Sequence, residues 1–428
     1  MQLDTLRRID RYLGSPLCWI LSLIRRAYGL IWTNPGLPNP KKVLIIKLSE
    51  MGSTVLGYPA LAELKNQGVG LHFLVFAKNA AIMEVLQLAP SQNIIVVDYQ
   101  TPWKLLLSGV RAMLRLFQER FDTAIDMDFF SRLTALISFV VCRGNRVGFH
   151  RYNDEGLYRG DLLTHRVLYS PHIHTSAAFM SLVRTLYQQP NDEPYYRGEI
   201  IPNELRLPRY EPEAAALDSI RHKLLSAGVD PSNHLVILIN PNSSEIFPLR
   251  KWPLKYYAEL CQQLLDKTPE CALVITGVSS ERDDARYILA EVQSPRCVDF
   301  TGCTSFRELL ALYSLSALMV TNDSGPAHFA SLLRLPTVVL FGPETPRLYS
   351  PIGDRHKDMY SNFSCSPCVS VYNGKKSPCR ENRCLMAISP KAVLKEVLSS
   401  LDDSATMNGR LIASRTRRLD AKAIAVAE

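Results

Sequence analysis

Several features that would place this chain in a familiar class are missing from its sequence. No stretch reaches the 18 or so uninterrupted apolar residues that would span a bilayer. Charged residues interrupt the short apolar run near the start, and no small-residue cleavage site of a secretory signal follows it. The ten cysteines do not form the regular framework of a small secreted domain. These absences favour a protein of the reducing cytoplasm, with thiols that are free or metal-bound.

A dinucleotide-binding fingerprint is also missing. A nicotinamide- or flavin-dependent oxidoreductase would carry G-x-G-x-x-G after the first strand of a domain. The two places where it would stand read KLSEMGSTVLG and NPNSSEIFP, and neither matches. The sequence therefore argues against this class of enzyme.

Composition describes a globular protein of more than one domain. The chain has 428 residues, of which 47% are hydrophobic and 21% are charged, so two domains of roughly 150–200 residues are expected. The formal net charge of +8 favours anionic partners. Charge alone does not choose among a phosphorylated substrate, nucleic acid and a lipid headgroup surface.

Short apolar runs alternate with helical patterns through both halves of the chain, which predicts parallel βαβ units. A proline-rich, charged stretch with no sustained period interrupts this alternation and predicts a domain junction. We therefore expect an α/β protein with two doubly wound domains facing each other across a cleft. The predicted segments are a helical extension and linker (1–40), a first domain (41–190), a linker (191–213), a second domain (214–401) and a flexible tail (402–428).

The first 32 residues carry an amphipathic pattern of their own. Apolar residues recur every three or four positions and predict one helical face: Leu6, Ile9, Leu13, Leu17, Ile20, Ile24, Tyr28 and Ile31. Gly14-Ser15-Pro16 predicts a break between two helices, and several arginines lie off the apolar stripe. Two interpretations stay open: a basic helix lying in the membrane interface, or an amphipathic helix packed on the protein itself.

Three predicted strand ends in the second half carry polar side chains. One runs from Asn240 into Pro241-Asn242-Ser243-Ser244, one into Asp323-Ser324-Gly325, and one reaches Glu344. Ligands of open α/β sheets bind beyond such strand ends, and the helix after Gly325 would point its N-terminus at a phosphate. Taken one at a time, these residues have ordinary structural explanations, such as a helix cap, a surface charge or a histidine packed in the core. Their place at consecutive strand ends favours a binding site.

Three segments now resemble a known family. VLIIKLSEMGSTVLGYPAL, NPNSSEIFPLRKWPLKYYAEL and TNDSGPAHFASLLRLPTVVLFGPETP are similar to motifs of glycosyltransferase family 9, the ADP-heptose:lipopolysaccharide heptosyltransferases. The resemblance covers most of residues 41–400. It implies a GT-B fold, with the nucleotide-sugar in the second of two Rossmann-like domains and the acceptor in the first. It also implies transfer with inversion at the anomeric carbon, without a required metal.

The same resemblance implies roles for particular residues. Lys251 and the helix N-terminus at 324–328 would stabilise the departing diphosphate, while Asp323 would hold sugar hydroxyls. The predicted donor-binding residues are Asn240, Ser243, Ser244, Arg250, Lys251, Asp323, Ser324, Gly325, His328 and Glu344.

One position departs from the family pattern. Family members place an Asp after the glycine of the first loop as the catalytic base, but here Ser53 follows Gly52, and a serine hydroxyl is no base near neutral pH. We expect Asp128 to replace it, with Glu50 next; Lys47, Ser53 and Arg132 are the predicted acceptor contacts. Asp126-Met127-Asp128 also spells the D-x-D of a metal-binding transferase fold, although coincidence is favoured here.

Four cysteines form a further pattern in the loop 365–384. The spacing of Cys365, Cys368, Cys379 and Cys384 would suit a structural zinc, with Lys375, Lys376 and Arg380 offsetting thiolate charge. Ordinary buried cysteines are the alternative. The remaining six are expected to fill cores.

Together these features predict an inverting transferase that moves heptose from ADP-heptose to a lipopolysaccharide-core or related glycolipid. We expect peripheral contact with the inner face of the cytoplasmic membrane through the N-terminal helix, no nucleic-acid partner and no cofactor required for the chemistry. Two alternatives stay open: a transferase of another nucleotide-sugar, and an inactive sugar-nucleotide binding protein, which Ser53 suggests.

Overall fold

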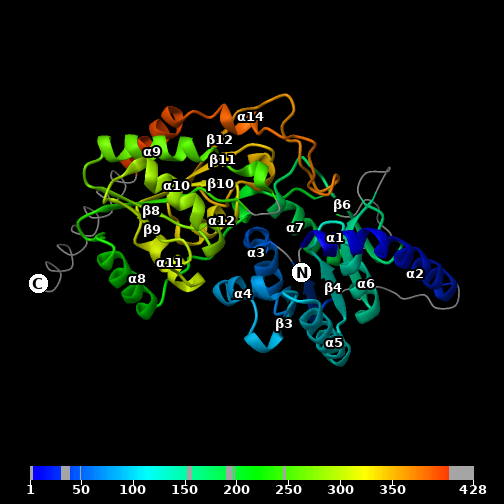
Figure 1. Cartoon of the computed structure of the whole chain (residues 1–428). Helices are drawn as coiled ribbons and strands as arrows, with labels where there is room; N and C mark the ends of the chain where they lie inside the picture. Colours follow the sequence, from blue (N-terminus) through cyan, green and yellow to red (C-terminus); the bar gives the residue numbers. More distant parts are fainter. Residues whose placement is uncertain are drawn as a thin grey trace, which may run out of the picture.

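The computed structural model describes residues 3–29, 39–48, 50–151, 157–188, 196, 198–243 and 247–403. Within them the chain forms two six-stranded sheets, and every adjacent pair of strands runs parallel. Helices cover both sheets (Figure 1), which confirms the predicted α/β architecture of two doubly wound domains. No helix in the described part of the chain is long and apolar enough to cross a membrane.

The first sheet has the order β3-β2-β1-β4-β5-β6 and lies within residues 41–190. Its central strands are nearly continuous apolar runs because helices cover both faces. The strands are β1 (Lys42–Ile46), β2 (Gly70–Phe76), β3 (Ile94–Val97), β4 (Thr123–Asp126), β5 (Asn145–His150) and β6 (His165–Leu168).

Helices α3 (Met51–Asn66), α4 (Ala80–Leu86) and α7 (Thr175–Arg184) share one hydrophobic cluster with this sheet. Helices α5 (Pro102–Glu119) and α6 (Arg132–Val141) belong to a separate cluster that includes alternate residues of β1 and β2. Successive strand residues point to opposite faces, so the two clusters lie on opposite faces of the sheet.

The second sheet has the order β12-β11-β10-β7-β8-β9 and lies within residues 214–401. Its strands are β7 (Leu235–Asn240), β8 (Cys271–Ile275), β9 (Cys297–Asp299), β10 (Leu318–Asn322), β11 (Thr337–Phe341) and β12 (His356–Tyr360). Its helices are α8 (Ala214–Ser226), α9 (Leu254–Lys267), α10 (Arg282–Val292), α11 (Phe306–Ser314), α12 (Gly325–Leu333), α13 (Pro346–Tyr349) and α14 (Arg383–Met386). Residues 390–403 form a last helical stretch.

Short 3-10 turns connect several of these elements. They are η1 (Ala77–Asn79), η2 (Ser91–Asn93), η3 (Thr185–Tyr187), η4 (Pro202–Glu204), η5 (Pro248–Arg250) and η6 (Ser279–Glu281). The junction between the sheets is tied by Arg184, whose guanidinium pairs with Glu63 at 3.0 Å and with Glu204 at 2.8 Å. Of the predicted linker and tail, 191–195, 197 and 404–428 lie outside the described residues.

The two domains meet through packed side chains. One hydrophobic cluster contains residues of α3 and α7 from the first domain together with residues of α11 and α12 from the second. The Tyr372 hydroxyl donates to the Tyr169 carbonyl at 2.9 Å, and Arg307 of α11 pairs with Glu84 of α4 at 2.9 Å. The strand ends of the two sheets are therefore held close to each other.

The N-terminal extension forms two helices, α1 (Leu3–Tyr12) and α2 (Gly14–Gly29), with the break where Gly14-Ser15-Pro16 predicted it. Both helices contact α6. Asp10 accepts the Leu133 amide at 2.7 Å, and Cys18 is fully buried. The predicted apolar stripe faces away from the protein instead: the exposed residues include Ile9, Leu13, Leu17, Ile20 and Ile24. Ile31 lies outside the described residues.

Candidate active site

Two helix N-termini meet at the domain junction, where α3 follows β1 and α12 follows β10 (Figure 1). A Cβ on Gly52 would lie 2.6 Å from Cδ2 of His328 and 3.2 Å from the Cα of Gly325. Only a residue without a side chain fits there. The loop of the first domain and the predicted phosphate-binding helix of the second are therefore in direct contact.

Asn322 organises the strand ends of the second domain. Its side chain is fully buried, accepts the Trp252 amide at 3.0 Å and donates to the carbonyl oxygens of Pro241 and Asn242 at 2.9 and 3.2 Å. This set of bonds fixes the loop after β7 against the end of β10. The sequence alone does not predict this structural role of Asn322.

The predicted donor residues after β7 make local contacts. The Asn240 amide donates to the Thr276 carbonyl at 3.1 Å and so ties β7 to the end of β8. The Ser243 hydroxyl donates to the Phe247 carbonyl at 3.2 Å. Ser244 lies outside the described residues. These hydrogen bonds within the protein fix the described residues of the loop.

Arg250 and Asp323 form an ion pair at the strand ends. The guanidinium Nη1 lies 3.4 Å from Oδ2 of Asp323, and neither side chain is more than 16% exposed. Burial raises the pKa of Asp323 above its usual value, although Arg250 acts in the opposite direction. The Arg250 guanidinium also stacks 4.8 Å from the centre of the Phe247 ring.

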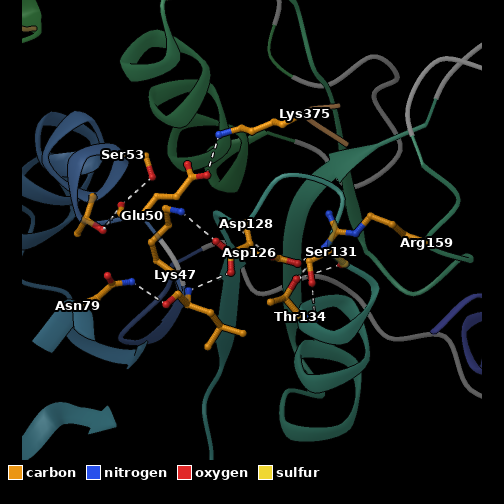
Figure 2. A network of polar contacts seen from close by, with 12 residues as sticks. Lys47, Glu50, Ser53, Asn79, Asp126, Asp128, Ser131, Thr134, Arg159 and Lys375 are labelled. Carbon is orange, nitrogen blue, oxygen red and sulfur yellow. Dashed lines mark hydrogen bonds and ion pairs between the residues drawn. The ribbon is translucent and has the colours of Figure 1, made fainter. Parts of the chain in front are cut away.

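Lys375 adds a second cation at the domain junction, and the sequence alone does not predict it there. Its Nζ lies 2.7 Å from Oε1 of Glu50, across the domain junction (Figure 2). The same ammonium lies 5.5 Å from the centre of the Phe247 ring and 5.7 Å from that of Tyr349. Phe247 is therefore bordered by both cations. In the sequence, Lys375 and Lys376 form a lysine pair in a polar turn, where the nearby cysteines suggest only a role in offsetting thiolate charge.

Glu50 occupies an unusual position directly before α3. Its φ of 69° lies in the left-handed region, which a non-glycine residue rarely adopts. Burial acts to raise its pKa, but Lys375, Lys47 and Arg250 outweigh burial and hold the pKa of Glu50 well below its usual range. In this arrangement Glu50 is an ionised carboxylate, held by cations.

Glu344 behaves in the opposite way. It is 2% exposed, and its Oε2 has no hydrogen-bond partner among the described residues. Burial raises the pKa of Glu344 to about 8; Lys375 acts against this shift, and the Asp323 carboxylate adds to it. A buried carboxyl group that titrates near neutrality is typical of functional sites.

A separate network occupies the ends of β1 and β4 (Figure 2). The Asp128 carboxylate accepts the Lys47 ammonium and the Leu48 amide, each at 2.9 Å, and the pair is nearly fully buried. Asp126 pairs with the buried guanidinium of Arg159. Both acids are thus engaged by protein cations, and no group of metal-ligating side chains forms among the described residues.

Four other predicted residues have clear positions. The Ser53 hydroxyl donates to the Glu50 carbonyl at 2.9 Å, and that of Ser324 donates to the Asn322 carbonyl at 3.3 Å, so Ser324 does not cap α12. The Lys251 ammonium pairs with Asp284. Arg132 pairs with Asp10 at 3.5 Å under the N-terminal helices. Lys251 and Arg132 are therefore each paired with a carboxylate outside the Glu50–Lys375 pair.

His328 is buried beside Gly52, and its Nδ1 has no partner in the described part of the chain. Burial is the main cause that lowers the pKa of His328, and together with the nearby His174 and Arg250 it brings this pKa to about 3. The imidazole is therefore neutral at physiological pH. It can accept or donate one hydrogen bond per ring nitrogen, but it carries no charge to a phosphate.

The four loop cysteines do not assemble into a metal-binding group. Cys365 and Cys379 are exposed, Cys368 is half-buried and Cys384 is buried. The Cys379 thiol donates to the Glu381 carbonyl at 2.8 Å. Among the described residues no three potential ligands come together, so the zinc prediction gains no support here.

Comparison with known proteins gives consistent matches. The model of the family described as Glycosyltransferase family 9 (heptosyltransferase) matches residues 110–377. The lipopolysaccharide heptosyltransferase 2 of Escherichia coli K12 is 29% identical over 159 residues, which cover 36% of this chain and 43% of that protein. The match thus spans less than half of this curated relative.

Solved structures resemble the whole two-domain architecture. That of the E. coli ADP-heptose lipopolysaccharide heptosyltransferase II has a TM-score of 0.64 at 19% identity, and covers 85% of this chain and 99% of its own. An E. coli heptosyltransferase solved with ADP has a TM-score of 0.59 at 14% identity, covering 84% and 99%. The likeness shows a shared fold, and the predicted GT-B architecture is confirmed.

Proposed function

This chain belongs to glycosyltransferase family 9, and on that premise we propose that it transfers a heptose from ADP-heptose to a lipopolysaccharide-core or related glycolipid. One observation carries the proposal within this family: Arg250 and Lys375 lie at the domain junction, each held by a carboxylate. A nucleoside diphosphate needs such cations where the strand ends and a helix N-terminus meet. The names of the similar proteins support heptose and ADP as the donor components.

In this proposal the diphosphate takes the place of two internal partners. Without a ligand, Arg250 pairs with Asp323 and Lys375 pairs with Glu50. A bound diphosphate offers both cations stronger anionic partners, and no divalent metal is then required. Asp323, released from Arg250, is free to accept hydroxyl groups of the sugar. Asn322 keeps the surrounding loop in place.

The transfer would proceed by a single displacement with inversion. The acceptor hydroxyl attacks the anomeric carbon from the side opposite the diphosphate, and its proton passes to a carboxylate base. The bond between the anomeric carbon and the diphosphate oxygen breaks, and ADP leaves with the electron pair. Arg250 and Lys375 stabilise the negative charge that develops on the departing oxygen.

Between the two candidate bases, the contacts favour Glu50. Asp128 uses one carboxylate oxygen to accept from Lys47 and the other to accept from the Leu48 amide. These contacts favour a role for Asp128 in positioning Lys47. Glu50 has Lys375 as its closest cation. When the diphosphate draws Lys375 away, the pKa of Glu50 rises toward its ordinary value, and Glu50 becomes a better base. Donor binding would thus activate the base.

Acceptor and location follow from the same proposal. A glycolipid acceptor resides in a membrane, and we propose that the protein works as a peripheral enzyme on the inner face of the cytoplasmic membrane. Lys47, Ser53 and Arg132 remain the proposed acceptor contacts. Because Arg132 is covered by Gly14 and paired with Asp10, it would reach an acceptor only if α1 and α2 moved.

The test is transfer itself. Purified protein is incubated with ADP-heptose and a heptose-deficient lipopolysaccharide core, and mass spectrometry measures the mass of one added heptose. UDP- and GDP-sugars serve as competing donors. A mass gain with another nucleotide-sugar and none with ADP-heptose would refute the donor assignment.

An inactive sugar-nucleotide binding protein is the second candidate. The Ser53 contact favours it, because the hydroxyl that stands at the family's acidic position only caps a backbone carbonyl. Thermal stabilisation by ADP without any turnover across acceptors would identify this case.

A further inference from the structure

Helix α5 carries two apolar faces, and only one of them packs on the sheet. Ala112 and Leu116 are buried against the first sheet. A second row points outward, with side chains between 44% and 72% exposed: Trp103, Leu106, Leu107, Val110, Leu114 and Phe117. At 100° per residue these six lie within an arc of about 100°, so they form one continuous stripe.

Helices α6 and α2 extend this stripe into a surface. α6 contacts both α5 and α2, and its Leu133 and Val140 are exposed. On α2 and the turn before it, the fully buried residues are small, and Leu21 is partly buried beside them. The outward residues are large and apolar: Leu13, Leu17, Trp19, Ile20, Leu23 and Ile24. We call the exposed residues of these three helices, with Leu13, the apolar surface. The three helices lie on the same side of the first domain (Figure 1).

The second domain has no counterpart among its described residues. Its exposed large hydrophobic side chains are scattered over separate elements: Leu225, Val278, Tyr287 and Met386. Single exposed hydrophobics need no explanation, but a contiguous patch on a water-soluble fold marks an interaction site. The apolar surface is therefore a feature of the first domain in particular.

Basic residues border the apolar surface. On α5, Lys104, Arg111 and Arg115 lie beside the apolar stripe. Lys104 pairs with Asp98 at 3.5 Å, and Arg115 shares Glu119, at 3.9 Å, with Lys42 at 2.5 Å. At its other end, Trp19 and Leu23 form part of the wall of a cavity of about 440 Å³. Four arginines line this cavity: Arg26, Arg151, Arg159 and Arg166. Arg159 is paired with the buried Asp126, while Arg26 and Arg166 share Asp161, the one carboxylate in the described lining, so the cations outnumber the carboxylates that hold them.

We propose that the apolar surface docks on an anionic lipid bilayer, with α5 as its main contact and the arginine-lined cavity receiving a lipid phosphate. Apolar stripes flanked by arginines and lysines, with tryptophan at the edge, suit the headgroup region of such a membrane. A second copy of this chain would bring the two basic borders together, and like charges repel. An anionic bilayer complements both the apolar and the basic parts.

This proposal rests on the proposed function, because membrane docking would bring the enzyme to a glycolipid acceptor that resides in the membrane. It differs from the sequence-based expectation in its location. The N-terminal helices contribute, but the longest stripe belongs to α5, inside the first domain.

The experiment uses the full chain and vesicles of phosphatidylethanolamine with or without phosphatidylglycerol, measured by co-sedimentation. We expect binding that requires phosphatidylglycerol and falls with salt. The variant Leu107→Gln/Leu114→Gln should bind about tenfold or more weakly, since two exposed leucines no longer enter the lipid. The matched control Leu225→Gln/Val278→Gln replaces equally exposed residues of the second domain and should bind like the unmodified chain.

Two results would overturn the proposal. One is equal vesicle binding by the α5 variant and the unmodified chain. The other is a dimer, detected by sedimentation equilibrium, that the α5 variant dissociates while vesicles are not bound. Transfer to a short detergent-solubilised acceptor separates this proposal from the proposed function: the α5 variant should keep that activity, whereas a chain without transferase activity would lack it and still bind vesicles.

Discussion

The ammonium of Lys375 lies 2.7 Å from the carboxylate of Glu50, and this ion pair joins the two domains through residues that are 325 positions apart in the sequence. Glu50 precedes α3 in the first domain, while Lys375 belongs to the loop between β12 and α14 in the second. The pair is partly buried and borders the rings of Phe247 and Tyr349. A ligand that competes for Lys375 would therefore act on both domains at once.

Replacing Lys375 tests its role as a diphosphate contact. Lys375→Met keeps an unbranched side chain of similar length, but the charge is lost. We expect the dissociation constant for ADP to rise about tenfold or more, because a charge-assisted hydrogen bond contributes roughly 1.5–3 kcal/mol. Isothermal titration calorimetry measures this constant directly.

The matched control is Lys376→Met, which removes the neighbouring exposed lysine of the same turn. It should bind ADP like the unmodified chain. Equal weakening by both variants would mean that only the net charge of the loop matters, and would contradict the specific contact.

Two carboxylate variants distinguish the base from a structural acid. Glu50→Gln should lower kcat by about 10²–10⁴, the range expected for loss of a general base, and should cost less stability than Asp128→Asn because Glu50 is 33% exposed. Asp128→Asn should act mainly on stability, because it leaves the buried Lys47 without its carboxylate, a loss of about 3–5 kcal/mol. Single-turnover transfer and urea unfolding measure the two effects.

Glu84→Gln is the control for these variants, since Glu84 is a half-exposed carboxylate of the first domain that pairs with Arg307. It should change neither kcat nor stability by much. A large loss of kcat in Asp128→Asn at unchanged stability, with full activity in Glu50→Gln, would reverse the assignment.

Glu344 should make stability depend on pH. Its pKa rises from the ordinary 4.5 to about 8 on folding, so between these values the folded chain keeps a proton that the unfolded chain releases. Its contribution is complete below pH 4.5 and is lost as the pH rises to about 8, by up to about 1.4 kcal/mol per pH unit. Glu344→Gln cannot release the proton, so it should become more stable than the unmodified chain as the pH increases.

Urea unfolding at pH 5 and pH 8 without nucleotide measures this difference. The exposed Glu381→Gln serves as the control and should show the same pH dependence as the unmodified chain. A constant difference between Glu344→Gln and the unmodified chain at both pH values would show that Glu344 does not take up its proton on folding.

The central strands could be predicted because they are buried apolar runs between polar loops. The edge strands β6 and β12 could not: β6 reads HRVL and β12 reads HKDMY, and neither carries a sustained apolar or alternating pattern. Strands of this kind form because a neighbouring strand supplies the hydrogen bonds. The N-terminal stripe was predicted as a helix face correctly, but the sequence could not tell that small residues would face the protein.

The site shows the same division. Strand-end chemistry predicted Asp323 and Glu344, because topology brings the ends of neighbouring parallel strands together. Arg250 lies in the turn η5 and was predicted from its charge instead. Lys375 could not be found in this way, since it lies in a loop that crosses to the other domain and its nearest sequence features are cysteines. The carboxylates of Asp126 and Asp128 were placed at the correct strand end, but their cationic partners lie far away along the chain.

Gly52 gives a test of the contact between the domains. In Gly52→Ala the new methyl group would lie 2.6 Å from the His328 ring, which is buried and cannot move away freely. We expect a loss of about 1–3 kcal/mol in the free energy of unfolding, the usual cost of overpacking, together with weaker ADP binding as α12 is displaced.

Gly109→Ala is the matched control: nothing lies within 4 Å of its added Cβ, so the helix should gain about 0.5–1 kcal/mol. The double variant Gly52→Ala/His328→Ala removes the overlap, and it should be more stable than additivity of the two single variants predicts. Strict additivity would show that residues 52 and 328 do not contact each other, and would contradict the close packing of the α3 and α12 N-termini.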